Sequence, residues 1–83
     1  MDNTVVIIFN NLKKKETVDL EVPIDITANE LVLALNTAYN LGIDVTNQKK
    51  CYLKAENPFA LLKGNKLLSE YGVRNGTVIN YTE

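Results

Sequence analysis

Eighty-three residues are enough for one domain with a single modest hydrophobic core. Hydrophobic residues make up 46% of the chain and charged residues 23%, which is typical of a folded globular protein and excludes a disordered one. A net charge of -1 excludes a strongly basic surface for nucleic acid, while one cysteine and no histidine exclude an internal disulfide, a thiol–imidazole nucleophile and a histidine zinc site.

The first two predicted strands form an antiparallel hairpin. Val5–Phe9 is β-branched and aromatic, Thr17–Val22 alternates apolar and polar residues, and the polar stretch Asn10–Glu16 lies between them. Pro23 ends the second strand. No apolar run exceeds five residues, which is far too short to cross a membrane, and no basic-then-apolar leader precedes the first strand. We therefore expect a cytoplasmic protein without direct membrane insertion.

One helix is predicted over residues 27–41. Thr27-Ala28-Asn29-Glu30 has the pattern of a capping box, in which the Thr27 hydroxyl accepts the amide of Glu30 and the Glu30 carboxylate accepts the amide of Thr27. Apolar residues at spacings of three and four then predict a single stripe: Leu31, Ala34, Leu35, Ala38 and Leu41. Gly42 is expected to end the helix in the left-handed conformation.

Further strands are predicted after the helix: Cys51–Glu56, the very short Leu61–Leu62 and Thr77–Thr82. The residues expected to face the core are Cys51, Leu53, Ala55, Ile79 and Tyr81. Two strands, a helix and two or three more strands are the order of an α+β protein of the β-grasp type, a mixed sheet of four or five strands wrapped around one α-helix. Residues 1–83 are expected to form this single domain.

Two segments carry a resemblance to a known family. Asp19-Leu20-Glu21-Val22-Pro23 precedes the helix, and Leu68-Ser69-Glu70-Tyr71-Gly72-Val73-Arg74-Asn75-Gly76-Thr77 precedes the last strand. With the order of the elements, they resemble ubiquitin and, more closely, the YukD/EsaB family of small ubiquitin-like proteins of bacterial type VII secretion systems, over residues 4–82. The main departure from that family is Glu56–Ala60, which we interpret as an insertion before the short strand.

The resemblance implies a non-conjugating adaptor or regulatory accessory protein of a type VII (WXG-substrate) secretion system. Such a protein binds other proteins, cytosolic parts of the apparatus, and has no enzymatic activity and no cofactor; whether it forms a homodimer stays open. Ubiquitin-like proteins that conjugate or carry sulfur use a C-terminal Gly-Gly, whereas this chain ends in Thr82-Glu83. The alternatives are a β-grasp sulfur carrier or protein modifier that has lost its diglycine tail, and a regulatory domain with an unrelated partner.

A protein-binding surface is predicted on the open face of the sheet. The first strand is apolar on both sides, whereas one helix covers only one side of a sheet. If the odd-numbered residues of that strand face the helix, Val6 and Ile8 face the open side. The predicted surface consists of Val6, Ile8, Tyr52, Lys54, Val78 and Asn80. β-propensity alone also explains two exposed aliphatic residues, so this second interpretation stays open.

Three other features are given structural roles. Cys51 is expected to be a small buried hydrophobe rather than a reactive thiol. The cluster Lys13–Lys15 is expected to be a solvated hairpin tip. Tyr71 resembles the tyrosine that fastens a loop of the ubiquitin fold through its hydroxyl.

Overall fold

The computed structural model describes residues 3–47 and 49–81. The elements are β1 (Thr4–Asn11), β2 (Glu16–Pro23), α1 (Ala28–Tyr39), β3 (Leu53–Glu56), β4 (Ala60–Leu62), a 3₁₀ turn (Ser69–Tyr71) and β5 (Val78–Tyr81). Every predicted strand is present, with ends that differ by a few residues from those expected. Residue 82, the last residue of the predicted closing strand, lies outside the described residues. Within those ranges, no helix has the length and apolar character that a membrane span requires.

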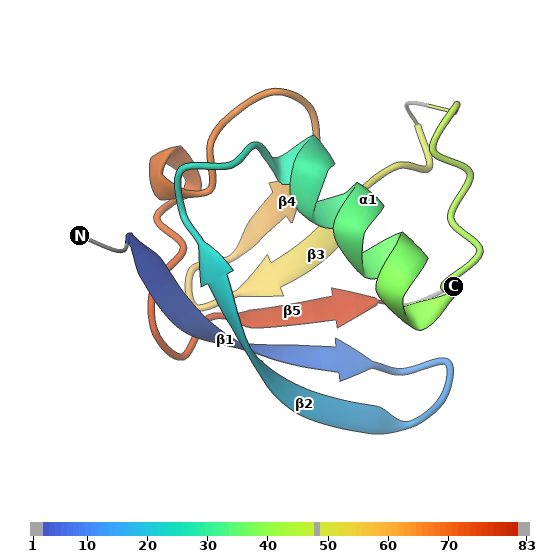
Figure 1. Cartoon of the computed structure of the whole chain (residues 1–83), viewed down its shortest axis with the longest axis horizontal. Coiled ribbons are helices and arrows are strands. Elements are labelled where there is room, and N and C mark those ends of the chain that lie inside the picture. The colour runs from blue at the N-terminus through green and yellow to red at the C-terminus, as the bar shows by residue number, and fades with distance from the viewer. Residues whose placement is uncertain (1–2, 48, 82–83) are drawn as a thin grey trace.

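The strands form one mixed sheet in the order β2-β1-β5-β3-β4 (Figure 1). β1 and β5 are parallel, and the other neighbouring strands are antiparallel. The single helix α1 crosses one side of this sheet (Figure 1). This arrangement is the predicted β-grasp, with five strands.

The hairpin of β1 and β2 buries the side of β1 that was predicted to face the helix. Ile7 and Phe9 are 0% and 1% exposed, and Val5 is half-buried against the same core. Ile7 lies opposite Leu20 and Phe9 opposite Val18 in the antiparallel register. Because side chains alternate along a strand, this register directs the even-numbered residues of β1 to the open side of the sheet.

The start of α1 is the predicted capping box. The Glu30 amide donates to Thr27 Oγ1 at 3.1 Å, and the Thr27 amide donates to Glu30 Oε1 at 3.0 Å. The predicted end is wrong, because the helix stops at Tyr39 and Asn40 takes the left-handed conformation with φ 52°. Asparagine tolerates this conformation, and the Asn40 amide caps the Asn36 carbonyl, so the helix ends before Gly42 is reached.

The buried face of α1 is rotated from the predicted stripe. Ala34 and Ala38 are exposed, and Leu41 is buried but lies beyond the helix, which corrects the prediction for these three residues. The buried helical residues are Ala28, Leu31, Val32 and Leu35. The rotation brings Val32 into the core and places the Tyr39 ring 5.1 Å from the Phe9 ring, so larger side chains cover the sheet than the two alanines could.

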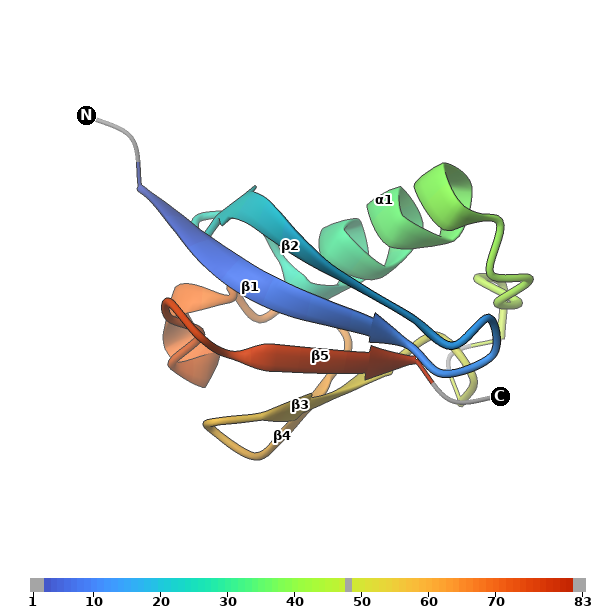
Figure 2. The ribbon, with the colours of Figure 1, turned by 90° about the horizontal axis from the view of Figure 1, so that it is seen from below.

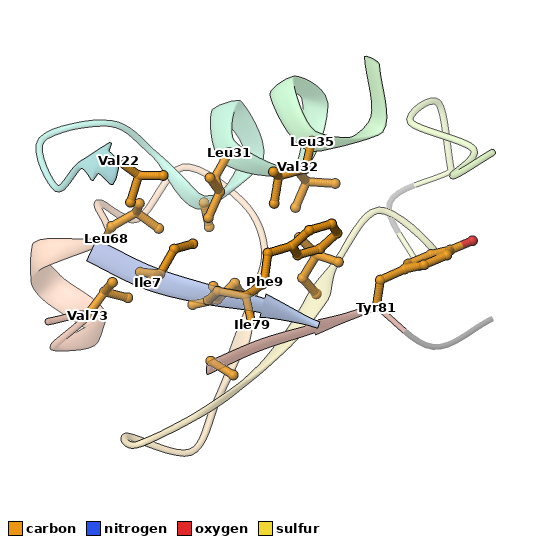
Figure 3. Packing of buried hydrophobic residues seen from close by; sticks show 14 of the residues in the cluster. Ile7, Phe9, Val22, Leu31, Val32, Leu35, Leu68, Val73, Ile79 and Tyr81 are labelled. Atoms are coloured by element: carbon orange, nitrogen blue, oxygen red, sulfur yellow. The ribbon is translucent and has the colours of Figure 1, made fainter. Parts of the chain in front are cut away.

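The core lies between α1 and the sheet (Figure 3). Ile7, Phe9 and Ile79 point from the sheet toward the helix, from which Leu31, Val32 and Leu35 point back. The predicted inward residues of the later strands are confirmed as buried: Cys51, Leu53, Ala55, Ile79 and Tyr81. β3 nevertheless begins at Leu53 rather than at Cys51, because residues 49–51 turn before the strand.

Two tyrosine hydroxyls fasten loops to this core. Tyr81 donates to the Leu41 carbonyl at 2.7 Å, which anchors the segment after α1 to β5. Tyr71 donates to the Lys63 carbonyl at 2.7 Å, which is the loop-fastening role expected from the resemblance. Buried phenols are usually hydrogen-bonded, and the hydrogen bond of Tyr81 joins two segments that lie 40 residues apart in the sequence.

Candidate interaction surface

One side of the sheet is not covered by the helix. In Figure 2, which is seen from below Figure 1, α1 lies to one side of the sheet, above the strands β1 and β5. The side chains on this open face alternate with the buried ones along each strand, so their positions follow from the strand register.

Val6, Ile8 and Val78 form an aliphatic group on the open face. Ile8 of β1 lies directly opposite Val78 of β5, and Val6 is two residues before Ile8 on the same strand. Val6 is 46% exposed, while Ile8 and Val78 are half-buried. The structure therefore brings these three predicted residues together.

The backbone under Val6 is held by the turn before β5. The Val6 amide donates to Asn75 Oδ1 at 2.7 Å, and the Gly76 amide donates to the Val6 carbonyl at 3.0 Å. The Ile8 amide donates to the Thr77 carbonyl at 2.9 Å. The aliphatic group is thus presented by backbone that is hydrogen-bonded on both sides, because β1 also pairs with β2. A surface fixed in this way loses little entropy when a partner covers it.

A line of polar side chains crosses the same face over four strands. Thr17 Oγ1 donates to Asn10 Oδ1 at 3.2 Å, and Asn10 Nδ2 donates to Asn80 Oδ1 at 3.1 Å. Asn80 Nδ2 then donates to Glu56 Oε2 at 3.1 Å. Asn80 is therefore a member of a hydrogen-bonded ladder rather than an isolated polar side chain.

Tyr52, Lys54 and Asn80 lie at a pocket with a volume of ≈ 410 Å³, at the end of the sheet where β3 begins and β5 ends. Three lysines and one carboxylate line it, which gives it a net positive charge. The lining residues are Gly42, Ile43, Asp44, Lys49, Lys50, Tyr52, Leu53, Lys54, Asn80 and Tyr81. The six predicted residues therefore divide into an aliphatic group and a pocket group, and Tyr52 does not join the aliphatic group.

Asp44 is the single acid of the pocket. The side-chain hydrogen bond from Thr46 Oγ1 to Asp44 Oδ1, at 2.6 Å, and the hydrogen bond from the Thr46 amide hold the pKa of this carboxyl below its ordinary value. The positive charge of Lys50 acts in the same direction. Asp44 therefore stays ionised at neutral pH and stabilises the turn that borders the pocket.

Two large apolar residues that the sequence did not indicate are also exposed. Phe59 is 85% exposed and Leu61 is 41% exposed. Both belong to the segment Glu56–Ala60 and the strand that follows it, and the segment forms the tight turn of the β3–β4 hairpin. A phenylalanine placed directly after Asn57-Pro58, in a turn where polar residues are the rule, was the available signal.

No group of three His, Cys, Asp or Glu side chains that could hold a metal ion occurs in residues 3–47 and 49–81. Cys51 is 5% exposed, and burial, with the nearby charge of Asp44, raises the pKa of its thiol. A raised pKa disfavours the thiolate, which agrees with the predicted role of Cys51 as a small buried hydrophobe. Lys13–Lys15 are exposed at the turn of the first hairpin, as expected.

Comparisons with known proteins give both a family and a fold. The profile of the family described as "WXG100 protein secretion system (Wss), protein YukD" matches residues 4–80. A search of curated proteins finds no match.

Solved structures similar to this chain are ubiquitin-like. A protein designed on the basis of ubiquitin has a TM-score of 0.64 at 20% identity, covering 94% of this chain and 85% of its own. The C-terminal ubiquitin-like domain of mouse tubulin-specific chaperone e has a TM-score of 0.66 at 14% identity, covering 99% and 90%. The UBL domain of Plasmodium falciparum Dsk2 has a TM-score of 0.61 at 18% identity, covering 95% and 99%. At these identities the likeness shows the ubiquitin-like fold alone.

Proposed function

The chain belongs to the YukD family of the WXG100 protein secretion system, and on this basis we propose that it is a non-conjugating, ubiquitin-like adaptor that binds another protein of that system through the open face of its sheet. We place it and its partner in the cytoplasm, where it would act as an accessory component without enzymatic activity.

The aliphatic group of Val6, Ile8 and Val78 is the observation that carries the proposal. These side chains are adjacent on β1 and β5, away from the helix, and the most exposed of them leaves 46% of its surface to water. Covering such a group releases water from apolar surface, which is the main favourable contribution in protein association. The polar ladder and the charged residues around the group supply the hydrogen-bonding rim that protein interfaces have.

A charge placed in this group tests the proposal. In the source organism, a strain without the gene is complemented with the wild type, with Val6→Lys or with Ile8→Lys, and secretion of a WXG100 substrate is measured. We expect both variants to accumulate like the wild type but not to restore secretion, because a lysine there must be desolvated at the interface. Ile8 is half-buried, so the midpoint of thermal unfolding of each purified variant is measured alongside.

Leu33→Lys is the matched control. Leu33 is 39% exposed on the outer side of α1, so the same change of charge falls on a surface of similar exposure away from the open face. Full secretion with Val6→Lys, or equal loss with Leu33→Lys, contradicts the assignment of the surface. Unchanged secretion in the deleted strain contradicts the secretion role itself. A covalent conjugate of this protein, detected by intact mass, favours the modifier or sulfur-carrier alternative instead.

A further inference from the structure

Phe59 is the most exposed large apolar side chain among the described residues, at 85%. Ala55 lies opposite Ala60 and Lys54 opposite Leu61 in the β3–β4 register. One step further toward the turn, Glu56 is the last residue of β3 and Phe59 is the turn residue before β4. Ala55 and Leu62 are buried, so the alternation directs Phe59 and Leu61 to the open face together with Lys54 and Glu56. Four side chains of one hairpin therefore form a surface of their own, which we call the hairpin surface: Lys54, Glu56, Phe59 and Leu61.

The turn that carries Phe59 is held by the segment before β5. Arg74 Nη2 donates to Asn57 Oδ1 at 2.8 Å, and Thr77 Oγ1 donates to the Asn57 carbonyl at 2.8 Å. Thr77 is completely buried, and its hydroxyl also accepts the Arg74 amide at 2.9 Å. An exposed aromatic ring on a fixed turn is preorganised as an anchor for a protein interface.

The charges of the hairpin surface indicate what covers it. Lys54 and Glu56 are both exposed, lie two residues apart on the same side of β3 and form no ion pair within the described part of the chain. Under two-fold symmetry this order makes the two charges complementary. If two copies lie face to face, with their β3 strands antiparallel and crossing at Ala55, Lys54 of each copy faces Glu56 of the other.

The same two-fold axis also pairs the two apolar residues of the hairpin surface. Leu61 is paired with Lys54, and continuing the same pairing by one step into the turn places Phe59 beside Glu56. A two-fold axis that crosses β3 at Ala55 therefore also brings Phe59 of each copy onto Leu61 of the other. In a two-fold interface every contact occurs twice with its residues exchanged, and both pairs of this surface meet that requirement about one axis.

We propose that the hairpin surface is a homodimer interface, in which two copies pack their β3–β4 hairpins about a two-fold axis at Ala55. Two Lys54–Glu56 pairs set the orientation, and Phe59 packed on Leu61 of the second copy supplies the apolar contact. The hairpin surface lies on β3 and β4, and the aliphatic group lies beside it on β1 and β5 of the same open face. The proposal is drawn from the register and charges of the hairpin and does not rest on the secretion role.

Charge exchange tests this geometry. Sedimentation equilibrium at low salt is used over a series of protein concentrations, and we expect the wild type to be in a monomer–dimer equilibrium that salt weakens. Lys54→Glu alone, or Glu56→Lys alone, converts both attractive pairs into repulsive ones and should weaken the dimer by about tenfold or more. The double variant with both changes in one chain restores two attractive pairs and should restore the dimer.

Mixing the single variants adds a stricter requirement. Lys54→Glu and Glu56→Lys should each be monomeric alone, whereas their equimolar mixture should form a heterodimer, because every facing pair is then Glu with Lys. Phe59→Ala should weaken the wild-type dimer without changing the midpoint of thermal unfolding, since the ring is almost fully exposed.

Several outcomes would overturn the proposal: a wild type that is monomeric at all concentrations, single charge variants that dimerise like the wild type, or a dimer that is indifferent to Phe59→Ala. None of these outcomes is a measurement of secretion. Because both surfaces lie on the open face of one sheet, Val6→Lys is also examined by sedimentation, and loss of secretion with an intact dimer separates the two proposals.

Discussion

Replacing Thr77 by valine removes one hydroxyl and almost no volume, and this hydroxyl joins two turns. Thr77 is 0% exposed, and its Oγ1 accepts the Arg74 amide at 2.9 Å and donates to the Asn57 carbonyl at 2.8 Å. Each hydrogen bond contributes about 0.5–1.5 kcal/mol net, so Thr77→Val should lower the free energy of unfolding by about 1–3 kcal/mol. In a domain of this size each kcal/mol corresponds to a shift of about 4–8 °C in the thermal midpoint.

Two measurements check this prediction. Urea denaturation gives the loss of free energy of unfolding, and hydrogen exchange reports the Arg74 amide, which should exchange faster once its acceptor is gone. Thr77→Ser is the control, because it keeps the hydroxyl, should retain protection of the Arg74 amide and loses only one methyl group, worth about 0.8 kcal/mol. If Thr77→Val leaves both the urea midpoint and the exchange rate unchanged, the hydroxyl does not join the two turns and the proposed preorganisation of Phe59 is refuted.

Three further predictions concern the core and two ionisable groups. Leu35→Ala should lower the free energy of unfolding by about 2–5 kcal/mol in urea denaturation, whereas Ala34→Ser, on the exposed side of α1, should cost about 0.5 kcal/mol or less. Thr46→Ala should raise the pKa of Asp44 in an NMR titration, because it removes the side-chain hydrogen bond that lowers it. Burial raises the pKa of the Cys51 thiol in the folded state, so the unfolded state loses its proton first; relative to Cys51→Ala, the wild type should therefore lose stability as the pH rises above the ordinary thiol value of 9.0.

The parts of the fold that depend on local chemistry were predictable from the sequence. The capping box at Thr27 and Glu30 involves residues three positions apart, and the inward side of β1 follows from its alternation and from the need to cover one face. The helix stripe was less predictable because alanine is suited to either environment. Because Ala34 and Ala38 were counted among the buried residues, the predicted apolar stripe was rotated from the buried face of α1. That Tyr39 lies on the buried face is shown only by the contact of its ring with Phe9.

The candidate surface was predictable only in part for a similar reason. Val6 and Ile8 were placed by the period of a single strand, and their neighbour Val78 by the expected sheet order. Tyr52 was placed by extending β3 two residues too far, so it lies at the pocket instead. The place of Phe59 in a turn was a local signal of its exposure, but the direction of its side chain was not predictable, because that direction depends on the register of the β3–β4 hairpin.

The parallel pairing of β1 with β5 has a mechanical consequence. The start of β1 and the end of β5 lie at opposite ends of the pair, which is bounded by the hydrogen bonds from Ile8 to Thr77 and from Leu12 to Tyr81. A pulling force applied at Thr4 and Tyr81 would therefore shear these hydrogen bonds, loading all of them together, instead of peeling them apart one after another. Resistance to stretching would come from this one pair of strands, which join the two extremes of the described sequence, while the hairpins on either side would carry little of the load.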